Sequence, residues 1–181
     1  MHVLTLTGPS GSGKTTIARA LVEQWGFYHP RSAVTRPRRP GEDNVEYEFE
    51  TIQGWKRREA NGEFVEKTEY RGHLYAMLRE SFEQHEKLVA VLDRNGLQQI
   101  RDAFPGRVTS ILLLPPNVAS LKGRLVARGA KHKEIQERLA NVYTEMTPSD
   151  MFDEIMVNKR IGLVIAEIAV LPGFNTTKHA G

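Results

Sequence analysis

The sequence contains no cysteine in its 181 residues. This absence excludes a disulfide framework, a thiolate metal site and a cysteine nucleophile. Long apolar runs are also missing, because no stretch approaches the roughly 18 to 20 residues that a membrane-spanning helix needs. The first residues, Met1 to Val3, lead directly into strand-like sequence without the pattern of a signal peptide. We therefore expect a cytoplasmic protein that does not associate with membranes.

A strong excess of one charge is missing as well. The 25 lysines and arginines nearly balance the 22 aspartates and glutamates, which leaves a formal charge of +3. The arginines fall in short groups rather than along one helix face, so they indicate a small phosphate-rich substrate and not a nucleic acid. The length is sufficient for one well-buried core. We expect one domain that is a monomer or a weak homodimer.

Strand-like and helical sequence alternate over most of the chain, which favours a parallel sheet with helices on both faces. Apolar runs predict strands at residues 3–7, 88–92, 108–114 and 155–157. Helices are predicted at residues 15–25, 96–104, 118–128, 134–146 and 161–171. The expected fold class is therefore α/β.

Residues 32–81 have a different character. Two stretches alternate like half-exposed strands and flank a short helix, with the strands at 47–49 and 64–70 and the helix near 53–60. We interpret this segment as a strand-rich insertion that forms a smaller lobe. The core would then consist of residues 1–31 and 82–181.

A glycine-rich segment follows the first predicted strand. Residues 8–15 read G-P-S-G-S-G-K-T and match the phosphate-binding loop pattern G-x-x-x-x-G-K-[ST] at every fixed position. The glycines let the backbone turn its N–H groups inward, which makes an anion-binding nest at the N-terminus of the next helix. Lys14 adds a positive charge for the β- and γ-phosphates, and the Thr15 hydroxyl can bind Mg²⁺. The predicted ATP site consists of Gly8, Ser10, Gly11, Ser12, Gly13, Lys14, Thr15 and Thr16.

A second group of motifs begins in the insertion. Residues 32–42 read S-x-x-x-R-x-x-R-P-G-E, and a tyrosine, G-E-F-x-E, G-x-x-Y, D-x-x-G, R-L-x-x-R-G and R-L follow in that order. Together with the phosphate loop, these motifs resemble guanylate kinase over most of the chain, as far as Asn158. The resemblance implies a P-loop kinase fold with a strand-rich monophosphate-binding lobe and a short lid at about 128–138.

The resemblance also implies an acceptor site made of Ser32, Arg36, Arg39, Tyr47, Glu66, Tyr75 and Asp93. Arg36, Arg39 and Tyr47 would hold the phosphate, since guanidinium forks bind phosphate oxygens bidentately. Glu66 would read guanine, because a carboxylate can accept both the N1–H and the amino group of that base. From the residues alone, a solvated basic loop and an outward-facing strand carboxylate stay open as alternatives.

Arg124, Arg128 and Arg138 form a third group. Phosphoryl transfer develops negative charge on the moving group, and the attacking phosphate oxygen is already anionic, so arginines rather than a general base are expected. Together with Lys14, these three arginines are the predicted catalytic residues. The alternative is that they are surface partners of Glu134, Glu137 and Glu145.

Two positions differ from the usual family pattern. Met77 stands where a serine or threonine hydrogen-bonds guanine, and Val91 replaces the first aspartate of an Asp-x-Asp pattern, so that only Asp93 is left. Neither change affects the phosphate sites. We expect a kinase that moves the γ-phosphate of MgATP to GMP or dGMP, while Met77 leaves a different or modified nucleotide open as the acceptor.

Two further alternatives come from related proteins. Ribose 1,5-bisphosphate phosphokinase is similar in length and resembles this chain at Thr35-Arg36 and at residues 41–43, but it has no need for Tyr47 and Glu66 together. Guanylate-kinase-like modules of scaffold proteins bind phosphopeptides without catalysis. Those modules have lost the intact phosphate loop that this sequence keeps.

Overall fold

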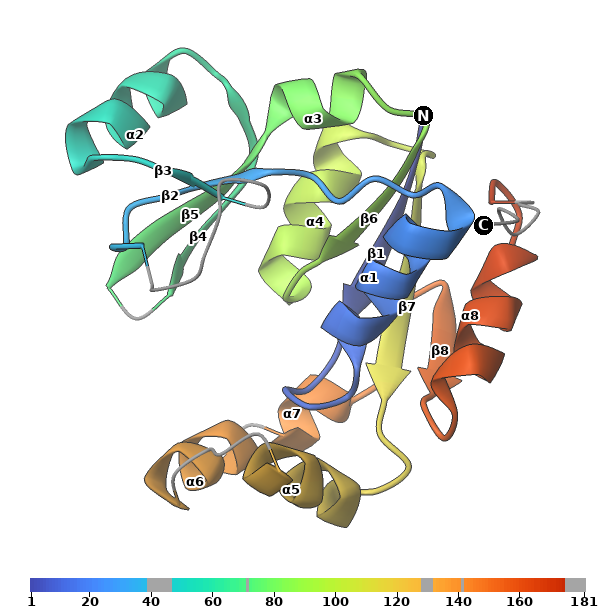
Figure 1. Cartoon of the computed structure of the whole chain (residues 1–181). Helices are drawn as coiled ribbons and strands as arrows, with labels where there is room; N and C mark the ends of the chain where they lie inside the picture. Colours follow the sequence, from blue (N-terminus) through green and yellow to red (C-terminus); the bar gives the residue numbers. More distant parts are fainter. Residues whose placement is uncertain (39–46, 71, 128–131, 141, 175–181) are drawn as a thin grey trace.

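The computed structural model describes residues 1–38, 47–70, 72–127, 132–140 and 142–174 (Figure 1). The described residues form two four-stranded sheets, and we call the one with more strand residues the larger sheet. The larger sheet is parallel throughout and has the strand order β6-β1-β7-β8. Its strands are β1 (His2–Thr7), β6 (Lys87–Val91), β7 (Val108–Leu114) and β8 (Glu154–Val157). The predicted α/β fold with a parallel sheet is confirmed.

Helices cover both faces of this sheet, because successive side chains of a strand point to opposite sides. Leu4 of β1 packs with Ile17 and Ile165 on one face. Val3 points to the other face and packs with Ile100. The helices of this part are α1 (Lys14–Trp25), α3 (Arg79–Glu83), α4 (Arg94–Ala103), α5 (Val118–Ala127), α6 (His132–Ala140), α7 (Val142–Met146) and α8 (Ile161–Ala169).

Three of these helices, α5, α6 and α7, lie beyond the carboxyl ends of β1 and β7 (Figure 1). They therefore stand at the edge of the sheet where ligands of parallel α/β folds bind. The longest helix in the described ranges, α1, has 12 residues, and none of the described helices is both long and apolar enough to cross a bilayer.

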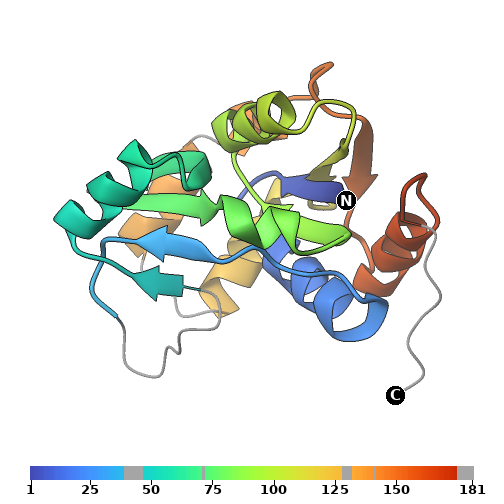
Figure 2. The same cartoon turned by 90° about the horizontal axis from the view of Figure 1, so that it is seen from above.

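The smaller sheet has the order β3-β2-β5-β4 and extends to one side of the core (Figure 2). Its strands are β2 (Ser32–Val34), β3 (Tyr47–Phe49), β4 (Phe64–Tyr70) and β5 (His73–Leu78), and α2 (Ile52–Ala60) packs against it. Trp55 of α2 lies against Phe64, Ala76 and Leu78. These contacts give the sheet an apolar cluster of its own.

The sequence does not predict β2, β5 or α3. β2 has three residues and β5 lacks alternation, because Ala76, Met77 and Leu78 are all buried. The helix predicted at 96–104 begins at Arg94, since the Asp93 side chain accepts a hydrogen bond from the Gly96 N–H at 2.8 Å and caps it. The single helix predicted at 134–146 corresponds to α6 and α7.

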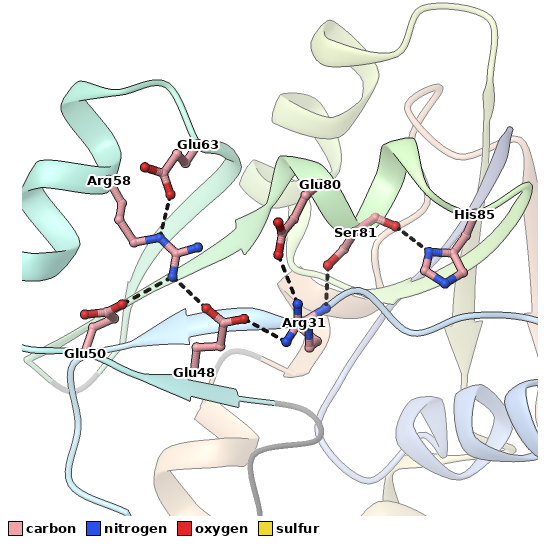
Figure 3. A network of polar contacts seen from close by, with 8 residues as sticks. All are labelled: Arg31, Glu48, Glu50, Arg58, Glu63, Glu80, Ser81 and His85. Carbon is pink, nitrogen blue, oxygen red and sulfur yellow. Dashed lines mark hydrogen bonds and ion pairs between the residues drawn. The ribbon is translucent and has the colours of Figure 1, made fainter.

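An ionic network ties the segments of the smaller sheet together (Figure 3). Arg58 of α2 donates to Glu48 at 2.7 Å, to Glu50 at 3.2 Å and to Glu63 at 2.8 Å. Arg31, just before β2, pairs with the same Glu48 at 2.9 Å and with Glu80 of α3 at 3.0 Å. The network therefore spans the smaller sheet from α2 to the helix that leads back to the core.

Candidate active site

The phosphate loop connects β1 to α1. Gly8, Gly11 and Gly13 have φ values of 138°, 88° and 108°, which lie in a region that side chains other than glycine rarely adopt. A Cβ atom at Gly8 would collide with the Leu113 carbonyl oxygen, and one at Gly13 would collide with the side-chain amide of Asn158. Glycine is required at both positions for conformation and for space.

Two side chains hold this loop from outside. Arg124 of α5 donates to the carbonyls of Gly11 at 3.0 Å and Ser12 at 3.3 Å. Asn158, which is 1% exposed, donates from Nδ2 to the same Ser12 carbonyl at 2.7 Å. Because the N–H and C=O of one peptide point in opposite directions, these bonds turn the Gly13 N–H into the loop.

Sequence reasoning assigns Arg124 to catalysis and gives Asn158 no role. In the structure, Arg124 contacts loop carbonyls and also donates to the Asn158 carbonyl at 3.3 Å. Asn158 directly follows β8, at the carboxyl edge of the parallel sheet. That position is the signal that could have identified it, since ligand sites of α/β folds gather there.

The inner side of the loop borders a cavity of about 950 Å³, whose lining includes Ser10, Lys14, Thr15 and Glu145. The Lys14 ammonium donates to the carbonyls of Gly8 at 2.6 Å and Pro9 at 3.0 Å. Partial desolvation raises the pKa of Glu145, while the Lys14 charge and a hydrogen bond from the Ser10 backbone lower it. Glu145 of α7 thus lies at the phosphate loop, a position that its sequence context does not reveal.

A second cavity, of about 710 Å³, lies between α1 and the smaller sheet. Four of its lining residues form one row across the four strands, since Tyr47 pairs with Ser32, Ser32 with Met77 and Met77 with Glu66. Paired residues on neighbouring strands point to the same face of a sheet. The register therefore brings together the predicted residues Ser32, Tyr47 and Glu66, with Met77 between two of them.

Tyr75 and Asp93 line the same cavity, so five of the seven predicted acceptor residues share it. Arg36 is 7% exposed, donates to the Pro37 carbonyl at 3.0 Å and lies 5.1 Å from the ring centre of Tyr47. Arg39 lies outside the described residues.

A β-bulge places Glu66 on the cavity face. Phe64 pairs with Leu78, but Glu66 pairs with Met77, so the register shifts by one residue at Val65. Phe64 consequently packs beside Trp55, whereas Val65 packs with Met77 on the opposite side. Strict alternation would have left Glu66 on the same side as Phe64.

The two cavities adjoin each other. Both are lined by Thr15, Tyr70, Val91, Leu92 and Asp93. A ligand on the phosphate loop and a ligand in the smaller lobe would therefore meet along a common wall.

The remaining predicted residues belong to the loop, to α1 and to the lid region. Ser12 is fully buried and Thr16 is exposed in the first turn of α1. Arg128 lies outside the described residues. Arg138 belongs to α6, but its side chain is not among those that the structure describes.

The sequence was compared with family models and with curated proteins, and both comparisons match it to guanylate kinases. The sequence model of the guanylate kinase family matches residues 1–171. Guanylate kinase of Symbiobacterium thermophilum is 35% identical over 176 residues, which cover 93% of this chain and 83% of that protein. Guanylate kinase of a Nostoc species is 38% identical over 175 residues, covering 93% and 87%.

A solved structure agrees with the sequence matches. The crystal structure of guanylate kinase from Anaplasma phagocytophilum superimposes with a TM-score of 0.72 at 26% identity, over 93% of this chain and 82% of that one. The phosphate loop is intact, and the cavity beside it is lined by five of the seven predicted acceptor residues. Because the matches also extend over nearly the whole sequence, the chain belongs to the guanylate kinase family.

Proposed function

We propose that the protein transfers the γ-phosphoryl group of MgATP directly to the 5′-phosphate of GMP or dGMP, which gives ADP and GDP or dGDP. The observation that carries this proposal is the wall shared by the two cavities. A triphosphate on the loop and a monophosphate in the second cavity would have their phosphates adjacent there. Such proximity supplies much of the rate enhancement of an in-line displacement.

The donor side suits a magnesium triphosphate. Mg²⁺ prefers oxygen ligands, keeps several waters and is usually bound through one or two protein oxygens plus substrate phosphates. Thr15 and Asp93 offer such oxygens in the donor cavity. Across the described ranges, no group of three histidines, aspartates or glutamates forms a cation cage, which agrees with a metal held mainly by its substrate. When bound, Mg²⁺ neutralises part of the charge on the β- and γ-phosphates.

The acceptor side divides into a phosphate end and a base end. We assign the phosphate to Arg36, Arg39 and Tyr47, because guanidinium groups carry the charge and the phenol adds a neutral hydrogen bond. We assign the base to Glu66, a residue that lines the cavity and is 4% exposed. Met77 offers no side-chain donor there; it lines the cavity together with Leu92, and both pack with the buried Val65.

The transfer itself needs no general base, since the attacking oxygen is anionic. Lys14, Arg128 and Arg138 stabilise the charge on the moving phosphoryl group. Arg124 acts behind the phosphate loop and keeps its amides directed at the triphosphate. The reaction passes through no covalent enzyme intermediate.

A panel assay tests the proposal. Purified protein with MgATP is supplied in turn with GMP, dGMP, AMP, dAMP, CMP, UMP and ribose 1,5-bisphosphate, and products are separated by chromatography. We expect kcat/KM to be highest for GMP or dGMP, and Lys14→Ala should abolish most of the turnover of every acceptor. A higher kcat/KM for ribose 1,5-bisphosphate or for another base would contradict the proposal.

A further inference from the structure

Arg94 is the first residue of α4 and borders the donor cavity, although sequence reasoning gives it no role. Its side chain is half-buried and reaches the segment that follows α6. Nη1 donates to the Ser149 hydroxyl at 3.1 Å, and Nη2 donates to the Thr144 carbonyl at 3.3 Å and to the Thr147 carbonyl. The guanidinium carbon also lies 4.9 Å from the ring centre of Phe152. One side chain of α4 therefore holds a separate segment at three acceptors and an aromatic ring.

This segment contains α7 and the residues directly after it. Thr144 lies in α7, and Thr147 follows its last residue. The last carbonyls of a helix have no partner within the helix, so a basic side chain that donates to them stabilises that helix end. Of the described residues of α7, only Val142 is buried. Apolar packing alone therefore holds α7 weakly, and the hydrogen bonds from Arg94 supply much of its attachment.

The position of α7 matters to the donor site in two ways. Glu145 of α7 lines the donor cavity together with Lys14. In the chain, α7 follows α6, the helix that carries Arg138. A displacement of α7 would therefore move a carboxylate at the phosphate loop and the base of the lid region at the same time.

Helix α4 is a firm support for such an attachment. Leu97 and Ile100 are fully buried in the core. Gln99 also exchanges two hydrogen bonds with the backbone of Lys67 in β4, since its Oε1 accepts from the N–H at 2.9 Å and its Nε2 donates to the carbonyl at 3.0 Å. Arg94 thus extends from a helix whose place is fixed by the core and by the smaller sheet.

We propose that Arg94 is a positioning residue for phosphoryl transfer, which fixes α7 against α4 so that α6 places Arg138 beside the transferred group. The inference rests on the proposed kinase function and adds a residue to it. Arg94 acts through α7 rather than on the substrate, because both of its Nη nitrogens already have protein acceptors. A misplacement of about 1 Å at a catalytic group can cost about 10²-fold in rate. Loosening of α7 should therefore appear in kcat.

Arg101 provides a matched control on the same helix. It donates from Nη2 to the Ser110 hydroxyl at 2.8 Å and to the Asp153 carboxylate at 2.7 Å. Both arginines thus connect α4 to residues that follow α7 in the chain. Of the two side chains, Arg94 lines the donor cavity, whereas Arg101 is not among the described residues that line either cavity.

Steady-state kinetics with both substrates varied is the first test. Arg94→Met should lower kcat roughly ten- to a hundredfold and change KM for ATP and GMP by less than about threefold. Arg101→Met should lower the thermal midpoint to a similar extent but leave kcat within about twofold. Arg94→Lys keeps the charge without the planar fork, so it should recover only part of kcat.

Three kinetic outcomes would overturn the inference. A rise in KM for ATP that exceeds the fall in kcat would mean that Arg94 contacts the nucleotide. Equal losses of kcat in Arg94→Met and Arg101→Met would indicate general support of the fold. Full recovery by Arg94→Lys would show that a positive charge alone suffices.

A distance measurement tests the placement of α7 without catalysis. The chain has no cysteine, so spin labels can be attached at Tyr143→Cys on α7 and Glu167→Cys on α8, both of which are exposed positions. Arg94→Met should broaden the distribution of label distances, and Arg101→Met should not. An unchanged distribution in Arg94→Met refutes the inference whatever the enzyme phosphorylates. A parent protein that phosphorylates neither GMP nor dGMP would instead refute the proposed function.

Discussion

The donor site and the acceptor site are built in opposite ways. The donor site is one continuous loop whose backbone N–H groups and three left-handed glycines make the anion nest. The acceptor site is a row of side chains contributed by four different strands, β2, β3, β4 and β5, which strand pairing brings side by side. A backbone nest is fixed by local sequence, whereas a side-chain row depends on register. Single substitutions in the donor site should therefore change kcat or the KM for ATP, whereas substitutions that disturb the smaller sheet should change the KM for GMP.

The largest expected effect concerns the lid side of the donor site. Arg138→Ala should lower kcat by roughly 10³ with little change in either KM, because the arginine acts mainly on charge that develops in the transition state. Steady-state kinetics with both substrates varied would measure it. Arg138→Lys keeps the charge but loses the planar fork, so it should recover only part of the rate. An effect confined to KM would assign Arg138 to ground-state binding.

The second effect concerns the centre of the donor site. Lys14→Ala should lower kcat/KM for ATP at least about a hundredfold, since it removes a preorganised charge beside the transferred group. Lys56→Ala removes an exposed lysine of α2 and should have no comparable effect. Near-normal turnover by Lys14→Ala would argue against a phosphoryl transfer that depends on this loop.

Removing a side chain that holds the phosphate loop from outside should have a smaller effect on ATP binding and turnover. Arg124→Ala removes two hydrogen bonds to loop carbonyls, and a loss of about 1 to 2 kcal/mol would raise KM for ATP roughly tenfold while KM for GMP stays the same. Calorimetric binding of ADP would report the same loss without catalysis. Lys122→Ala, on an exposed position of the same helix, is the matched control. A selective fall in kcat would instead indicate that Arg124 contacts the reacting phosphates.

The acceptor side should show the mildest change. Arg58→Met leaves Glu48, Glu50 and Glu63 without their shared cation, so the smaller sheet should lose stability by about 1 to 3 kcal/mol. We expect faster hydrogen exchange in α2 and β3 and a KM for GMP that rises severalfold, with KM for ATP unchanged. Arg57→Met replaces an exposed neighbour and serves as the control. Equal weakening of both substrates would mean that the network supports the whole molecule rather than one sheet.

Sequence reasoning performed best where chemistry is local. The phosphate loop could be recognised because Gly8, Gly13 and Lys14 lie within one short segment of the chain. Strands β6 and β7 could be recognised because burial on both faces makes their centres continuously apolar. The same reasoning missed β2 and β5, although β5 supplies Met77 and both strands complete the acceptor row. Short strands and strands without alternation carry too little periodic signal to be recognised alone.

The sequence by itself determined the parallel α/β core, the phosphate loop and, through its motifs, the kind of residues that an acceptor nucleotide would meet. The tertiary structure alone decided where those residues point. The bulge at Val65 turns Glu66 onto the cavity face, and burial, followed by the negative charge of Asp93, raises its pKa. Likewise, only the fold brings Arg124 and Asn158 against the Ser12 carbonyl. Hydrogen bonds between distant segments and the desolvation of a carboxyl group depend on neighbours in space, and the order of residues along the chain does not specify those neighbours.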